Sequence, residues 1–113
     1  DDFFLLIREI VDNYDLIIVV TLVYWYSMSG TMKIFFDRIS DCLKTGKKLR
    51  GMDLAVVTSA SDQILKSGFH MPFIETANYL GMNYIGDVHS WVIEGEIPDA
   101  VIQKKNRFVN DVS

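Results

Sequence analysis

The sequence predicts an α/β domain, a three-layer sandwich with a parallel sheet between layers of helices. Segments with apolar residues at helical spacing alternate with short apolar runs rich in β-branched residues, and these runs show no polar alternation. Strands that are apolar on both faces are typical of parallel sheets covered by helices, and a strict helix–strand alternation implies right-handed crossovers. The 113 residues fit a single domain of this kind.

The first half of the chain supplies two helices and one strand. Residues 3–11 carry apolar side chains at helical spacing, and Asn13 ends this predicted helix. Residues 16–20 form the most apolar strand, so we expect both of its faces to be buried. A polar and aromatic stretch follows, and a second amphipathic helix then places on its apolar side Met32, Phe35, Phe36, Ile39 and Leu43.

The second half continues the same alternation. Residues 54–57 form a second buried strand that ends in a loop at residues 58–61. Pro72 in the first turn and Gly81 as the stop delimit a third helix. A third strand near residues 84–91 and a last helix opened by Pro98 complete the order α-β-α-β-α-β-α. We expect the three strands to pair in consecutive order, with helices on both faces.

Three strands are few for this architecture, in which about five or six are usual. The strand at residues 16–20 is as apolar as a central strand, and a central strand needs a neighbour at each edge. We therefore expect residues 1–113 to be one partial domain, with its first strands in a preceding segment. The missing segment or another chain would cover this edge, so we expect the chain alone to self-associate or aggregate. We also expect the protein to be a homo-oligomer.

Charge and composition exclude several classes of partner. The formal net charge is −4 without a basic stripe, which argues against nucleic acid. The longest apolar run, residues 16–26, is shorter than the about 20 residues that cross a bilayer, so we expect no membrane span. The single cysteine cannot form an internal disulfide, and a reducing cytoplasm is the natural compartment. We expect no metal site, since His70 and His89 lack partners at ligand spacing.

Two strand ends carry unusual segments, and ligands of parallel α/β sheets bind outside the carboxyl ends of the strands. The first segment combines aromatic rings with small polar residues at the start of a helix: Leu22, Val23, Tyr24, Trp25, Tyr26, Ser27, Met28, Ser29 and Gly30. The second consists of small residues that let the backbone approach a ring closely: Thr58, Ser59, Ala60 and Ser61.

The first of these segments carries a family resemblance. Residues 15–20, then 23–30 as Val-Tyr-Trp-Tyr-Ser-Met-Ser-Gly, then 32–38 as Met-Lys-Ile-Phe-Phe-Asp-Arg, resemble the NADPH-dependent FMN reductase and multimeric flavodoxin group. The resemblance implies a flavodoxin-like fold of strand order 2-1-3-4-5, in which this chain supplies strands three to five. It also implies FMN and NAD(P)H as cofactors and a small-molecule electron acceptor, in a flavin or quinone reductase.

The resemblance further implies how the two segments act. Tyr24, Trp25 and Tyr26 would offer aromatic faces to the isoalloxazine, while amides of Ser27, Ser29 and Gly30 would bind its edge at the positive end of a helix. The flavin itself carries the hydride chemistry, so no catalytic acid or base of the protein is expected. The family's phosphate-binding loop has no counterpart in residues 1–113, so we expect this chain alone to bind FMN weakly or not at all, and the complete parent protein to bind it.

Structural interpretations stand beside these functional ones. The aromatic residues of the first segment can be core and rim packing, Met28 and Met32 can be core filler, and Ser27 or Ser29 can cap a helix. Lys33 and Asp37 can form an ion pair, and His89 can be a structural histidine or face the acceptor pocket. A hydrolase triad of Ser59, His89 and Asp62 lacks the nucleophile elbow G-x-S-x-G. The alternative function is a flavodoxin-like module for protein association without flavin, favoured by Leu22 where the family commonly has proline.

Overall fold

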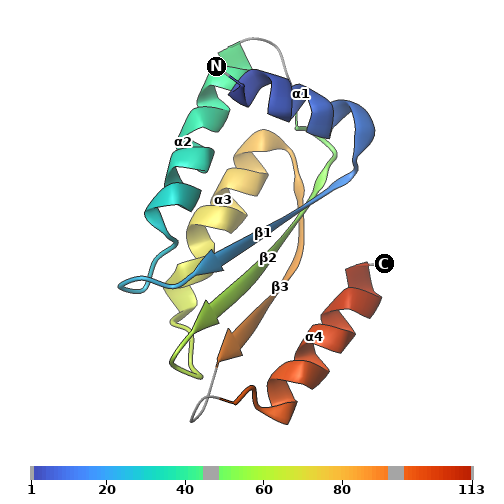
Figure 1. Cartoon of the computed structure of the whole chain (residues 1–113). Helices are drawn as coiled ribbons and strands as arrows, with labels where there is room; N and C mark the ends of the chain where they lie inside the picture. The colour runs from blue at the N-terminus through green and yellow to red at the C-terminus, as the bar shows by residue number, and fades with distance from the viewer. Residues whose placement is uncertain (1, 45–48, 92–95, 113) are drawn as a thin grey trace.

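The computed structural model describes residues 2–44, 49–91 and 96–112. It contains, in order, α1 (Phe3–Asn13), β1 (Leu16–Leu22), α2 (Gly30–Lys44), β2 (Asp53–Ala60), a short 3₁₀ helix η1 (Ser67–His70), α3 (Met71–Leu80), β3 (Asn83–Trp91) and α4 (Asp99–Val112). The predicted alternation is confirmed (Figure 1). The side chain of Leu43 lies outside the part of the chain that the structure describes.

The sheet has the predicted topology, with three parallel strands in the order β1-β2-β3. The β1–β2 ladder runs without interruption from the pair Leu16 and Asp53 to the pair Leu22 and Ser59. Because the strands are parallel and in step, the carboxyl ends of β1 and β2 lie at the same edge of the sheet. The two segments that the sequence singled out therefore meet there.

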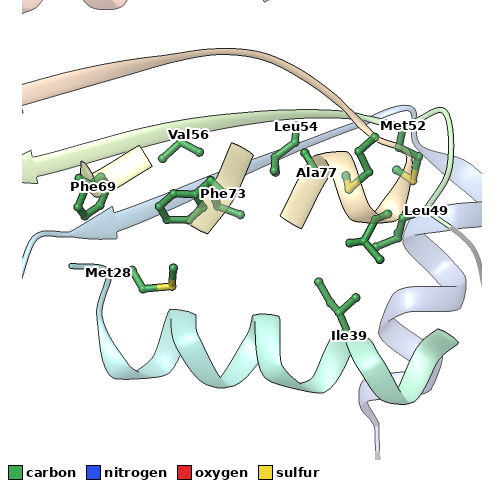
Figure 2. Packing of buried hydrophobic residues seen from close by; sticks show 12 residues of the cluster. Met28, Ile39, Leu49, Met52, Leu54, Val56, Phe69, Phe73 and Ala77 are labelled. Atoms are coloured by element: carbon green, nitrogen blue, oxygen red, sulfur yellow. The ribbon is translucent and has the colours of Figure 1, made fainter. Parts of the chain in front are cut away.

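Helices α1, α2 and α3 share one core with one face of the sheet. Val19 of β1 neighbours Val56 of β2, and both side chains enter this core together with Leu54. Phe73 of α3 is completely buried at its centre, and Figure 2 shows it between the strands and helix α2. Its ring meets Phe36 and Phe69 with centroids 5.4 and 5.6 Å away, in tilted and edge-on arrangements that aromatic pairs prefer.

The opposite face of the sheet is covered unevenly. Helix α4 packs against β3, where Val88 and Val101 are buried (Figure 1). On β1 the same face is open: Ile18, Val20 and Leu22 expose 44%, 66% and 51% of their surface. The expectation that this strand is buried on both faces is therefore wrong for the described chain, because no described helix lies over that side of β1.

The outer edge of β1 is also uncovered. Within the described sheet β1 pairs with β2 alone, so its other row of backbone groups has no strand partner. An apolar groove of about 490 Å³ runs along this edge between the strand and helices α1 and α2. Its walls are Ile10, Ile17, Ile18, Val19, Val20, Ser29, Thr31, Met32 and Phe35. An uncovered apolar edge of this kind is a template for pairing with another chain.

A bulge in β3 builds a polar cluster away from the candidate loops. The ladder shifts register between Leu54 and Ala55, and Gly86 takes a φ of 149° that favours glycine. The shift lets Tyr84 donate its hydroxyl to Asp87 at 2.8 Å, although residues three apart in a regular strand face opposite sides. Burial, and then this carboxylate, raise the pKa of the Tyr84 hydroxyl. His70 Nε2 lies 3.4 Å from the same carboxylate.

Phe73 gives a direct test of the core. Because its ring is 0% exposed, Phe73→Ala should lower the free energy of unfolding by about 3–5 kcal/mol through lost burial and a cavity. Phe4→Ala is the matched control, since Phe4 is 37% exposed and should cost less than about 1 kcal/mol. Urea unfolding followed by circular dichroism measures both, and equal losses would contradict the assigned core.

The open edge of β1 predicts self-association of the chain. Val20→Lys places a charge on the exposed apolar side of that strand, and edge lysines oppose strand pairing between molecules. We expect sedimentation velocity to show oligomers for the unsubstituted chain and monomers for this variant. Ile102→Lys, on the exposed part of α4, should leave the oligomers intact. A monomeric unsubstituted chain at high concentration would refute the expectation.

Candidate functional site

The two predicted segments meet at the carboxyl edge of β1 and β2. Leu22 pairs with Ser59 at the end of the ladder, and the Val23 amide then donates to the Ser59 carbonyl at 3.1 Å. This bond carries the pairing one residue past β1 and ties the aromatic segment to the small-residue segment. Both therefore border the same region outside the sheet, where α/β sheets bind ligands.

The small-residue segment is mostly strand and not a loop, which corrects the sequence-based boundary. Thr58, Ser59 and Ala60 belong to β2, and Ser61 is the first residue after it. The boundary was misplaced because parallel pairing with β3 extends β2, and hydroxyl-rich sequences do not reveal such pairing. Thr58 is completely buried, so its side chain faces the protein interior, while Ser61 is exposed.

Residues 24–27 form a tight hairpin that presents aromatic rings to solvent. The amide of Tyr24 donates to the Ser27 carbonyl at 2.8 Å, and the amide of Ser27 donates to the Tyr24 carbonyl at 3.0 Å. Trp25 and Tyr26 take φ values of 49° and 65°, the left-handed conformation that such two-residue turns need. Each left-handed residue with a side chain costs about 1–2 kcal/mol. No residue pattern indicated this turn, because it lacks the glycine or asparagine that usually marks one.

The three aromatic residues are not core residues. Tyr24, Trp25 and Tyr26 expose 55%, 93% and 64% of their surface, so the core-packing interpretation is wrong for them. Met28 is different: its side chain is buried in the main core, as the filler interpretation predicted (Figure 2). Met32 packs partly against that core. The backbone around Met28 thus has a fixed position beside the exposed hairpin.

The start of α2 is held by a hydrogen-bonded cap. Ser29 Oγ accepts a hydrogen bond from the Met32 amide at 3.2 Å, which confirms the N-cap interpretation for this serine. The Ser29 amide in turn donates to Thr21 Oγ1 at 3.1 Å, which links the helix to β1. The amides of Gly30 and Thr31 make no hydrogen bond with another described residue. They remain available at the positive end of the helix dipole.

The structural interpretations of the neighbouring charged residues are confirmed. Lys33 forms an ion pair with Asp37 one turn along α2, and the Arg38 guanidinium lies 4.4 Å from the centroid of the Phe3 ring. His89 is hydrogen-bonded through both ring nitrogens, to Thr58 Oγ1 at 2.7 Å and to the Asp62 carbonyl at 2.8 Å. It is therefore a structural histidine, and neither bond involves Ser59. Within the described residues no group of three or more potential ligands could hold a metal ion.

Comparison with known proteins agrees with this arrangement at the level of fold. The chain has a TM-score of 0.75 and 23% identity to the Trp repressor binding protein of Bacillus subtilis, covering 98% of this chain and 68% of that one. An NADPH-quinone reductase from P. pentosaceus gives a TM-score of 0.69 and 22% identity, covering 93% and 71%. Oxidised flavodoxin 1 from Bacillus cereus gives 0.53 and 19%, covering 99% and 88%. The fold is flavodoxin-like.

Family membership follows from the sequence profile of the NADPH-dependent FMN reductases, which matches residues 1–95. The chain belongs to this family, as the motif in residues 23–38 indicated. No curated protein matches the chain at the significance threshold. No helix in the described ranges is long and apolar enough to cross a membrane.

The positive φ of Tyr26 predicts that glycine is more stable than alanine at this position, the reverse of their order in a helix. Tyr26→Gly should give a chain about 1 kcal/mol more stable than Tyr26→Ala, because glycine adopts a positive φ without steric cost. Tyr79 is the matched control, since it is also exposed but lies in helix α3. There the glycine variant should be about 1 kcal/mol less stable than the alanine variant. Urea unfolding of the four variants measures both differences, and the same sign at both positions would contradict the turn.

Proposed function

We propose that this chain contributes the ring-binding side of an FMN site in an NAD(P)H-dependent oxidoreductase of the flavin or quinone reductase type. The observation that carries the proposal is the Val23–Ser59 hydrogen bond, which joins the aromatic hairpin to the end of β2 beside the start of α2. Family membership supports FMN and NADPH as the cofactors. The electron acceptor is proposed to be a small molecule.

The residues at this edge fit a flavin ring. Exposed aromatic faces stand next to two helix-terminal amides, of Gly30 and Thr31, that have no described partner. A side-chain atom added at Gly30 would meet nothing within 4 Å, so a planar group can approach the backbone there. Bound flavin would supply hydride transfer between NAD(P)H and the acceptor.

The chain's own residues would then have distinct roles. The rings of Tyr24, Trp25 and Tyr26 would exclude water from one side of the ligand and stack against it. The amides at the start of α2 would hold the polar edge of the ring by hydrogen bonds strengthened by the helix dipole. Ser59, Ala60 and Ser61 would form the opposite wall with small side chains. Leu22, Val23, Ser27, Met28, Ser29 and Thr58 complete the proposed site, mainly by positioning this backbone.

A comparison of two flavins tests the proposal on the chain itself. The described residues contain no glycine-rich phosphate loop between a strand and a helix, so the chain should bind the ring and ignore the phosphate. We therefore expect fluorescence titration to show weak binding of both flavins. The dissociation constants for FMN and riboflavin should agree within about threefold. Submicromolar binding of FMN with strong preference over riboflavin would contradict a ring-only site.

Tyr24 gives the residue-level prediction. Tyr24→Ala should weaken the binding of both flavins by about 1–3 kcal/mol, because an aromatic contact and its buried area are lost. Tyr79→Ala is the control: this tyrosine is 80% exposed on α3, away from the carboxyl edge. Unchanged affinity of the Tyr24 variant, measured by the same titration, would refute the assignment of the hairpin to the flavin.

The second candidate function is a flavodoxin-like module that binds no flavin and serves protein association. The open edge of β1 and its exposed Ile18, Val20 and Leu22 favour it. Sedimentation and flavin titration together separate the two candidates. A chain that self-associates through β1 but binds neither flavin supports the module, whereas flavin binding that is lost in the Tyr24 variant supports the oxidoreductase.

A further inference from the structure

The segment that follows β2 has few anchors. Residues 61–65 make no hydrogen bond between their backbone and the backbone of another described residue. Ser61, Asp62 and Ile64 are exposed, and Ile64 exposes 77% of its surface. At the far end Leu65 packs partly against the core, and the η1 turn begins after Lys66. The near end forms the wall of the proposed flavin site opposite the aromatic hairpin. Something else must fix that end if the wall is to keep its position.

His89 of β3 contacts both the neighbouring strand β2 and the near end of the segment that follows it. Its Nε2 lies 2.8 Å from the carbonyl oxygen of Asp62, and its Nδ1 lies 2.7 Å from Oγ1 of Thr58. Thr58 is completely buried and pairs with His89 in the β2–β3 ladder, so it offers a rigid base. The imidazole thus bridges the interior of the sheet and the segment after β2.

The hydrogen-bond partners of the imidazole determine which of its nitrogens carries a hydrogen. A carbonyl oxygen can only accept, so Nε2 must carry a hydrogen and donate it to Asp62. In the neutral ring Nδ1 is then an acceptor, and the Thr58 hydroxyl donates to it. In the charged ring Nδ1 donates, and the Thr58 hydroxyl can turn to the Val88 carbonyl, which is 3.4 Å away. The bond to Asp62 is made in both states.

Neighbouring groups restrict the rotation of the imidazole. The ring stacks on Trp91, with centroids 6.1 Å apart and an angle of 25° between planes. Trp91 is 3% exposed, and the ammonium of Lys104, a residue of α4, lies 5.1 Å from the centroid of its ring. Helix α4 therefore contacts the tryptophan of this stack. Asp87, Lys104, Arg107 and Asp111 line the same shallow pocket as His89. This pocket therefore carries two carboxylates and two basic side chains.

We propose that His89 is a positioning residue that fastens the segment after β2 to β3 and so sets one wall of the flavin site. The inference rests on the proposed function for its consequence, since the wall matters only if the ring binds there. The fastening itself rests on geometry alone: a buried hydroxyl, a fixed ring and a carbonyl at the start of an otherwise weakly held segment. Sequence spacing could not reveal it, since His89 lies 27 residues from Asp62 and 31 from Thr58.

Two substitutions separate the hydrogen bonds from the packing. His89→Gln keeps an amide donor group and a carbonyl acceptor and can bridge Asp62 and Thr58, whereas His89→Leu keeps bulk but makes neither bond. Both lose the stack on Trp91, so their difference reports the bonds. We expect the backbone order parameters of residues 62–64, from NMR relaxation, to stay at about 0.85 in the original chain and the glutamine variant and to fall below about 0.6 in the leucine variant. His70→Gln, at the other histidine, should leave this segment unchanged.

The unsubstituted chain supplies an independent readout that does not need a variant to fold. Nitrogen NMR of the imidazole at high pH should show a neutral His89 with the proton on Nε2 and an unprotonated Nδ1. A ring with its proton on Nδ1 would overturn the proposal, because the bond to Asp62 could not then exist. Equal order parameters for residues 62–64 in the leucine and glutamine variants would overturn it as well.

Flavin titration completes the test and keeps the two proposals apart. His89→Leu should weaken FMN and riboflavin binding by the same factor, about three- to tenfold, since the wall contacts the ring and not the phosphate. Lower order parameters with unchanged flavin affinity would overturn the positioning role although the fastening is real. If the unsubstituted chain binds neither flavin, the proposed function fails, and the positioning role fails with it. The order parameters and the nitrogen NMR result then still test the fastening.

Discussion

The parallel ladder between β1 and β2 is the interaction on which the candidate site depends. Its seven pairs run from Leu16 and Asp53 to Leu22 and Ser59 without a bulge, so both strands finish at one level. The Val23 amide extends the pairing onto Ser59 and starts the hairpin at a fixed place. A slip of one residue would turn Val19 out of the core and move the hairpin away from the end of β2.

The loop after β1 stores strain that its surroundings oppose. Two consecutive left-handed aromatic residues are unfavourable, and the turn persists because both of its ends are held. Before it, Val23 bonds to β2. After it, Met28 is buried and the Ser29 amide bonds to Thr21. The outcome is that Trp25 projects into solvent at the edge where the helix α2 begins. Backbone strain in exposed residues is typical of functional segments, and this strain does not stabilise the core.

The uneven cover of the sheet explains why β1 differs from its sequence. Along β1, Val19 and Thr21 are buried, and the residues before, between and after them are exposed. These exposed residues, Ile18, Val20 and Leu22, are all apolar. Such residues suit a strand covered on both sides. The folds with which the chain aligns contain additional polypeptide, since this chain spans 68% and 71% of two of them. The open side and the open edge are thus the surfaces on which further chain or another molecule would have most effect on stability.

Local sequence patterns determined the class of fold, the element order and the ends of several helices, whereas strands β1 and β2 end later than predicted, at Leu22 and Ala60. Apolar spacing separates helix from strand, Pro72 and Gly81 delimit α3 because of their fixed and permissive φ angles, and Ser29 caps α2 through a bond only three residues long. The resemblance in residues 23–38 also indicated the family. These features depend on near neighbours, so the sequence alone is sufficient for them.

Tertiary structure decided what depends on distant partners. Strand β2 extends through Thr58, Ser59 and Ala60 because β1 and β3 supply hydrogen bonds on both sides. The left-handed turn exists because its two ends are tied to separate elements, and no residue type announces it. His89 meets Asp62 across 27 residues, and the exposure of β1 reflects which helices lie over it. Each of these outcomes is set by contacts between segments far apart in the chain, which periodicity and motif spacing do not encode.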